Sequence, residues 1–64
     1  MITLYDFLQL AIEDDYKINI FDNEKGEEVA HQIELSEIDD ALQDRIIASW
    51  DIEYITKELC INLE

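Results

Sequence analysis

Apolar residues near the start of the chain recur with the spacing of an α-helix. They are Leu4, Phe7, Leu8, Ala11 and Ile12. Positions three and four residues apart share one face of a helix, so this spacing indicates an amphipathic helix. Thr3 and Asp6 form a capping box at its start, with Asp in place of Glu. The acidic residues 13–15 lie where the helix dipole favours cations, which predicts that the helix ends there.

The following segments alternate with the period of two that is typical of β-strands. Residues 16–21 place Tyr16, Ile18 and Ile20 on one face and Lys17, Asn19 and Phe21 on the other. The turn-forming run 22–26 ends in Gly26, which suits the left-handed position of a turn. Residues 27–33 alternate again, with Val29, His31 and Ile33 on the inward face. These two segments predict a hairpin.

The second half of the chain repeats this order. Ser36 and Asp39 give a capping signature beside a narrow apolar stripe. The pattern predicts a short helix, and a single helical turn is the alternative. One face of the next segment consists of Ile46, Ala48, Trp50, Ile52 and Tyr54. Residues 56–58 then connect it to a last strand at 59–63, so a second hairpin is expected.

The order of these elements, α-β-β-α-β-β, indicates the α+β fold class. The simplest arrangement is a four-stranded antiparallel sheet with the short helices on one face. The composition supports a folded chain, because 48% of the residues are hydrophobic and the sequence has no proline and one glycine. We therefore predict that residues 1–64 form a single compact acidic domain with a thin core.

Charge is the most unusual property of the composition. Seventeen Asp and Glu residues oppose four Lys and Arg residues, and the formal net charge is −13. Such an imbalance destabilises the compact state through self-repulsion, so we interpret it as functional. It also argues against direct binding to nucleic acid or to anionic membranes, because Lys and Arg supply the affinity for phosphate groups. A basic protein surface is the expected partner.

The predicted faces place carboxylates on two strips. The open face of the sheet carries Glu28, Asp51 and Glu53, and the outer side of the second helix carries Glu37, Asp40 and Asp44. Carboxylates two residues apart in a strand stand about 6.6 Å apart, which is near the spacing of successive phosphates. The strips are therefore interpreted as imitating a nucleic-acid backbone. The alternative is that they are solvated faces whose charge serves solubility.

Three large apolar residues, Phe21, Ile47 and Ile55, are expected on the open face or near its edges. Exposed apolar groups among polar ones often mark an interface. This candidate apolar interface supports a second reading of the chain, as a homodimer that associates through the open face or a strand edge.

No motif in the sequence indicates catalysis, a cofactor or a metal. His31 has no accompanying nucleophile motif, and Trp50 is interpreted as a packing residue. The acidic run that begins at Asp22 does not match an EF-hand, because Gly26 falls fifth and the twelfth position is Ile33. We predict a protein that is not an enzyme and has no catalytic, cofactor or metal residues.

The single cysteine, Cys60, cannot form a disulfide within the chain, which favours a reducing compartment. Residues 1–12 lack the basic start and long apolar run of a signal peptide, and no stretch reaches the roughly 20 apolar residues of a membrane span. A cytoplasmic protein is therefore expected.

The core patterning of three segments, Thr3 to Leu8, Tyr16 to Asp22 and Ser49 to Ile52, together with the short terminal strand, resembles that of small acidic proteins from phages and mobile elements of Gram-positive bacteria. The resemblance carries over no catalytic residue. It implies an anti-defence context in the host cell cytoplasm, in which DNA mimics block restriction enzymes, CRISPR effectors or other host proteins that bind nucleic acid.

Two functions follow as predictions. The first is a non-enzymatic acidic binding protein that occupies a basic, nucleic-acid-binding surface of a host protein. The alternative is a small homodimeric structural or regulatory module whose acidity serves solubility.

Overall fold

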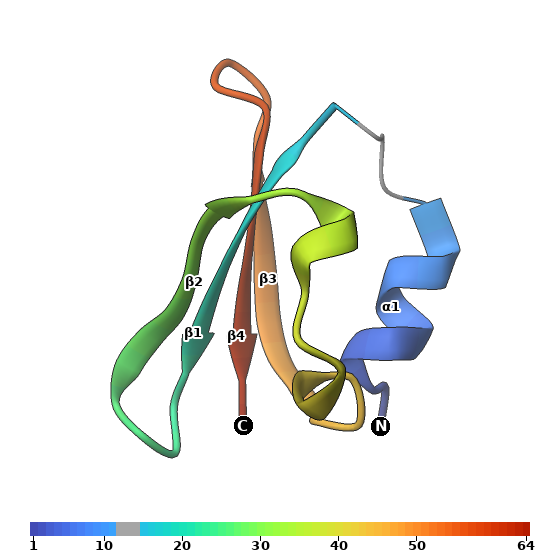
Figure 1. Ribbon diagram of the computed structural model, residues 1–64, viewed down its shortest axis with the longest axis vertical. Coiled ribbons are helices and arrows are strands. Elements are labelled where there is room, and N and C mark those ends of the chain that lie inside the picture. Colours follow the sequence, from blue (N-terminus) through green and yellow to red (C-terminus); the bar gives the residue numbers. More distant parts are fainter. Residues whose placement is uncertain (12–14) are drawn as a thin grey trace.

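The computed structural model, which describes residues 1–11 and 15–64, contains one short α-helix and a four-stranded sheet (Figure 1). The elements are α1 (Leu4–Ala11), β1 (Lys17–Asp22), β2 (Glu27–Ile33), β3 (Ile47–Glu53) and β4 (Glu58–Leu63), with two 3-10 turns, η1 (Leu35–Glu37) and η2 (Asp40–Leu42), between β2 and β3. The α+β class is confirmed. No helix in this described part of the chain is long and apolar enough to cross a membrane.

Helix α1 begins where the sequence predicts it. The Thr3 hydroxyl oxygen accepts a hydrogen bond from the Asp6 N–H at 3.1 Å, as in a capped helix. Leu4 is fully buried, and Phe7 and Leu8 are half-buried against the core. The sequence predicts the end of the helix at residues 13–15, and of these residues 13 and 14 lie outside the described part of the chain.

The sheet is mixed, so the prediction that all strands are antiparallel is wrong. Its strand order is β2-β1-β4-β3. The two outer pairs are antiparallel hairpins, whereas the central strands β1 and β4 are parallel. Figure 1 shows that the segment 34–46 runs back along the sheet, so that β3 points the same way as β2. Hydrophobic periodicity specifies which face of a strand is buried but not the direction of its neighbour, and this connection was therefore not predictable from the pattern.

The predicted second helix is replaced by two 3-10 turns, which is closer to the single-turn alternative. The turn η1 has Glu34 as its N-cap, not Ser36, and Glu34 and Glu37 form a capping box. Between the turns, Ile38 and Asp39 have extended backbone. The Asp39 carboxylate accepts a hydrogen bond from the backbone N–H two residues later at 3.0 Å. Such local bonds compete with the helical ladder, which explains the interruption.

The core lies on one face of the sheet. Its buried members are Leu4, Ile18, Ile20, Ile38, Ile47, Leu59, Ile61 and Leu63. Five of them come from the central strands β1 and β4, which have a strand neighbour on both sides. Helix α1 contributes Leu4 and the segment 34–46 contributes Ile38, so both pack on this covered face. The predicted turn between β1 and β2 is confirmed, with Gly26 at a φ of 68° and its N–H bonded to the Asp22 carbonyl at 2.8 Å.

Irregular pairing in the edge strands changes the predicted faces. The register of β3 shifts between Ile47 and Ser49, and one extra residue in a strand reverses the alternation of its side chains. Ile47 therefore joins the core at 9% exposure, and its predicted place on the open face is wrong. The register shift in β2 that places Ala30 opposite the buried Ile20 acts in the same way on its neighbour His31, which is exposed and not inward.

Candidate functional site on the open face of the sheet

The side chains that point away from the core form the open face of the sheet. Strand register aligns them in three rows across β3, β4 and β1. The rows are Glu53, Glu58 and Lys17; Asp51, Cys60 and Asn19; and Ser49, Asn62 and Phe21, with Glu28 of β2 beside Phe21. The end of this face beside the turn between β3 and β4 is the more acidic end. Glu53 and Glu58 lie directly opposite one another there, and Asp51 is in the next row.

We call Asp51, Glu53 and Glu58 the acidic corner. Neutral donors position each of its carboxylates. Asp51 accepts a hydrogen bond from the Ile52 N–H at 3.0 Å, and Glu53 accepts one from the Ile55 N–H at 3.3 Å. These contacts restrict the side chains without neutralising them, so the corner presents ordered negative charge.

Glu58 is the best-ordered member of the acidic corner. Its Oε1 atom accepts hydrogen bonds from the side-chain amides of Asn19 at 3.0 Å and Gln32 at 3.2 Å. The backbone N–H of Gln32 in turn donates to the Asn19 side-chain oxygen at 2.7 Å, which fixes the orientation of the Asn19 amide. The hydrogen bonds from Asn19, Thr56 and Gln32 lower the pKa of Glu58, although burial acts in the opposite direction. The carboxylate is therefore held in its ionised form.

Sequence reasoning missed Glu58, because it assigned residues 56–58 to a connection. The available signal was the length of that connection. Residues 54–57 form the turn, and Glu58 is then the first residue of β4, directly opposite Glu53. A four-residue turn between the two strands would have placed these two carboxylates side by side.

Most of the cations in the chain form ion pairs elsewhere. Lys17 lies 2.8 Å from a Glu34 oxygen, Lys57 lies 2.7 Å from an Asp15 oxygen, and Arg45 binds Asp22. These are three of the four Lys and Arg residues. None of the ion pairs between described residues involves the acidic corner. The negative charge of the corner is consequently left for solvent or for a partner.

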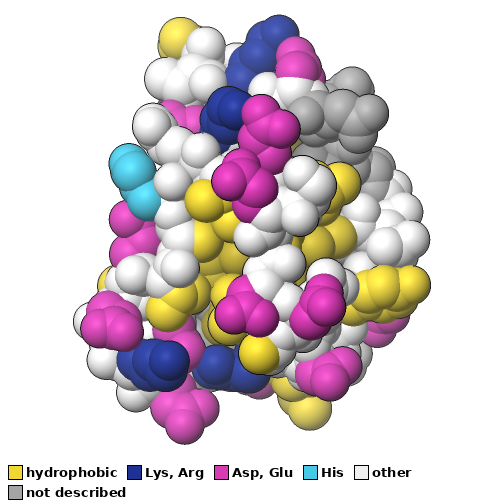
Figure 2. All heavy atoms as spheres, viewed as in Figure 1, with side chains coloured by type: hydrophobic (Ala, Val, Ile, Leu, Met, Phe, Trp, Pro, Cys, Tyr) yellow, Lys and Arg dark blue, Asp and Glu magenta, His cyan; other side chains and the backbone are white. Residues whose placement is uncertain are grey.

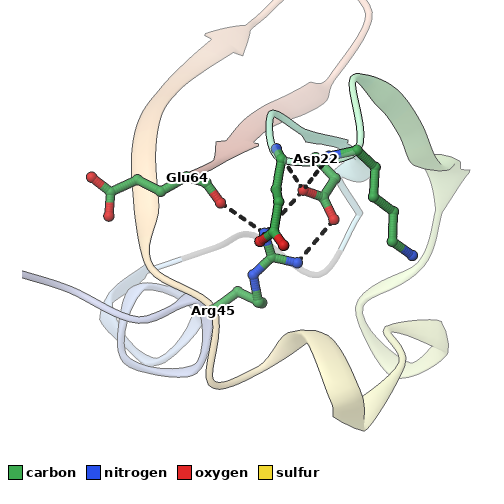
Figure 3. Close-up of polar contacts among 5 residues, drawn as sticks. Asp22, Arg45 and Glu64 are labelled. Carbon is green, nitrogen blue, oxygen red and sulfur yellow. Dashed lines mark hydrogen bonds and ion pairs between the residues drawn. The ribbon is translucent and has the colours of Figure 1, made fainter.

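The ion pair between Asp22 and Arg45 lies at the other end of the sheet (Figure 3). Asp22 is fully buried, and its two oxygens accept hydrogen bonds from the two guanidinium nitrogens of Arg45 at 2.9 Å each. Arg45 also donates to the backbone oxygen of Glu64 at 2.7 Å. The Arg45 hydrogen bonds lower the pKa of Asp22 from 3.8 to about 2, against the effect of burial. This arrangement joins the end of β1, the end of the segment 34–46 and the residue after β4, and its role is structural.

The six acidic residues predicted to bind a partner do not form one surface. Asp51 and Glu53 lie on the open face in the edge strand β3. Glu28 lies on the opposite edge strand, where its carboxylate is 3.1 Å from the Nδ1 atom of His31. The remaining three, Glu37, Asp40 and Asp44, belong to the segment that crosses the covered face. Figure 2 shows carboxylates spread over the visible side of the molecule, with hydrophobic side chains gathered between them.

The candidate apolar interface does not form one patch either. Ile47 is buried, whereas Phe21 is 37% exposed and Ile55 is 92% exposed. Phe21 pairs with Asn62, and Ile55 lies in the turn beyond Glu58. The rise of β4 from residue 58 to residue 62 separates their rows by about 13 Å.

The groups considered for chemistry occupy ordinary surroundings. Cys60 is half-buried, and its sulfur accepts a hydrogen bond from the Asn19 side-chain amide at 3.6 Å. Among residues 1–11 and 15–64, no group of three or more His, Cys, Asp and Glu side chains is arranged to hold a metal ion.

Comparisons with known proteins do not assign this chain to a family. No family model matches the sequence, and searches of curated proteins and of solved structures gave no match. The function is therefore inferred from the geometry and the charge of the open face.

Proposed function

We propose that this chain is a non-enzymatic acidic binding protein that occupies a basic, nucleic-acid-binding surface of a host protein, as an anti-defence inhibitor of phage origin would. The acidic corner is the proposed contact. The observation that carries the proposal is the contrast between the ordered carboxylates in the corner and the internal pairing of three of the four cations.

Order in the corner favours binding as well as charge. A partner that binds mobile carboxylates must first restrict them, whereas Glu53 and Glu58 already have fixed hydrogen-bond partners. The net charge of −13 adds long-range attraction for a basic surface. Association should therefore be fast at low salt and slower as salt screens the field.

The geometry of the corner also supports imitation of a nucleic-acid backbone. Asp51 and Glu53 are two residues apart on one face of β3, which corresponds to about 6.6 Å. Glu58 is opposite Glu53 on β4, and neighbouring strands lie about 4.8 Å apart. Two of the carboxylates thus follow one another along β3, and the third lies beside Glu53 on the neighbouring strand.

Displacement of DNA provides the test. A fluorescent DNA duplex is bound to purified restriction enzymes and CRISPR effectors of Gram-positive bacteria, and fluorescence anisotropy follows its release as this protein is added over a series of salt concentrations. We expect release from at least one of these proteins, weakened by salt. A polyglutamate of equal charge controls for a generic polyanion effect.

Two double variants locate the contact. Asp51→Lys with Glu53→Lys reverses the acidic corner, and Asp40→Lys with Asp44→Lys makes the same change in net charge on the segment 34–46. We expect the first variant to lose about tenfold or more in displacement and the second to behave nearly as the original protein. Equal losses, indifference to salt, or no displacement from any protein tested would contradict the proposal.

The homodimeric alternative has weaker support, because Phe21 and Ile55 lie far apart and Ile47 is in the core. Sedimentation equilibrium distinguishes the two functions. A monomer is expected at physiological salt, and a stable dimer would favour the alternative.

A further inference from the structure

Among the described residues, the outer edge of β3 lacks a strand neighbour over most of its length. β3 is the last strand in the sheet order. Its beginning is covered by the bridge between Thr3 and Ile46 and by the hydrogen bond from the Ile47 N–H to the Ile2 carbonyl at 3.0 Å. From residue 48 to residue 53, no other described strand pairs along this edge. An edge of this kind can accept an extended segment from another chain.

The main chain of β3 is oriented for such pairing. The Ile52 N–H donates to the Asp51 carboxylate, so this N–H points away from β4. Main-chain groups of alternate residues in a strand point to the same side. The N–H and carbonyl of Trp50, two residues earlier, therefore lie along the same outer edge.

The side chains along this edge differ between the two faces. On the covered face, Trp50 is 52% exposed and Ile52 is half-buried. The Trp50 ring rests against Phe7 of α1, with ring centroids 5.3 Å apart. On the open face, the same stretch of β3 carries Asp51 and Glu53. The edge thus has one apolar side and one acidic side.

We propose that this edge binds an extended basic segment of the partner protein by strand addition, in which Lys or Arg residues alternate with apolar residues. The inference rests on the proposed function and specifies the form that its partner takes. The cationic side chains of the added strand face Asp51 and Glu53. Its apolar side chains pack beside Trp50 and Ile52, while main-chain hydrogen bonds supply the rest of the affinity.

Charge complementarity selects this occupant over a second copy of the chain. Antiparallel pairing of two β3 edges would bring Asp51 and Glu53 of each copy onto one face, and like charges in neighbouring strands are destabilising. Each copy would also contribute a net charge of −13.

The hydrogen bond from Ile52 to Asp51 makes the edge selective. In the free protein the Asp51 carboxylate occupies the N–H that an added strand needs. A Lys or Arg side chain of the incoming segment attracts this carboxylate and releases the N–H to donate to a carbonyl of the segment. A neutral segment offers the carboxylate no new partner, so its addition is disfavoured.

Synthetic peptides test the proposal on the full chain. The probe is a seven-residue peptide of alternating Lys and Val. One control has the same residues with the lysines grouped together, and a second has the alternating order with its central backbone amides N-methylated. We expect the alternating peptide to bind about tenfold more tightly than either control and to slow amide hydrogen exchange at Trp50 and Ile52.

A matched pair of variants tests the role of charge at the edge. Asp51→Asn keeps a side-chain oxygen but removes the charge, and Asp44→Asn removes the same charge from the turn after η2. We expect about tenfold weaker binding of the alternating peptide for Asp51→Asn and little change for Asp44→Asn.

The outcomes separate this inference from the proposed function. If the three peptides bind equally, or if exchange at Trp50 and Ile52 is unchanged, strand addition is overturned, whereas DNA displacement sensitive to Asp51 and Glu53 would keep the acidic corner as a binding surface. If neither the peptides bind nor DNA is displaced, both proposals fail.

Discussion

Asp22 and Glu58 are carboxylates of the same sheet with opposite surroundings. Asp22 ends β1 on the covered face, where it is fully buried and bound by the guanidinium of Arg45. Glu58 begins β4 on the open face at the other end, where the amides of Asn19 and Gln32 hold it. Both pKa values are lowered, but a cation lowers the first and neutral donors contribute most to the second.

The difference shows how an acidic chain can use its few cations. Arg45 neutralises the buried charge of Asp22, which would otherwise have no cation beside it. A buried carboxylate that loses its cation strongly destabilises the fold. Amides order Glu58 and leave its charge in place. The pairing partner, and not the type of residue, thus decides whether a carboxylate stabilises the fold or is available for binding.

The largest effect on stability is expected from the loss of the cation that pairs with Asp22. Arg45→Met leaves the Asp22 carboxylate buried without its cation, and we expect the melting temperature to fall by about 10 °C or more. Lys17→Met removes the same charge but breaks only the exposed pair with Glu34, so a fall of a few degrees at most is expected. Thermal unfolding followed by circular dichroism measures both. Equal losses would show that the two pairs contribute alike.

The second prediction concerns the loss of stability at low pH. Because the pKa of Asp22 is about 2 in the folded protein and ordinarily 3.8, the unfolded chain binds this proton more readily. The stability that Asp22 contributes is therefore complete above about pH 4 and is lost as the pH falls from about 4 towards 2. Urea unfolding at a series of pH values measures this loss. Asp22→Asn should flatten the dependence in that range, and an unchanged slope would exclude Asp22 as its source.

The smallest effect on stability is expected from a substitution of Glu58. Glu58→Gln keeps the shape of the side chain and removes a negative charge that faces Glu53. We expect a change of a few degrees or less in melting temperature, together with about tenfold weaker DNA displacement. A loss of stability as large as that of Arg45→Met would reverse the comparison, because Glu58 would then be structural.

Periodicity alone predicted the elements whose side chains alternate without interruption. Helix α1 with its Thr3 cap, the turn at Gly26 and the buried faces of β1 and β4 follow the sequence pattern. The pattern was misleading where a strand contains an extra residue, as at Ile47 and His31, since each bulge reverses the faces beyond it.

Contacts between distant residues were beyond the reach of the pattern. Arg45 meets Asp22 across 23 positions, and Asn19 meets Glu58 across 39. Both contacts depend on the parallel pairing of β1 and β4, which arises from the path of the segment 34–46. Of the candidate site, the sequence supplied Asp51 and Glu53 in β3, whereas Glu58 required the register of the second hairpin.

The position of the two chain ends has a practical consequence. Residues 1 and 64 lie at the same end of the molecule, and the β3–β4 turn lies at the opposite end (Figure 1). The backbone of Ile46 holds both ends there, through its bridge to Thr3 and its hydrogen bond from the Glu64 N–H at 2.9 Å. A biotin or fluorophore attached to either end therefore points away from the acidic corner, and protein immobilised in this way presents the corner to solution.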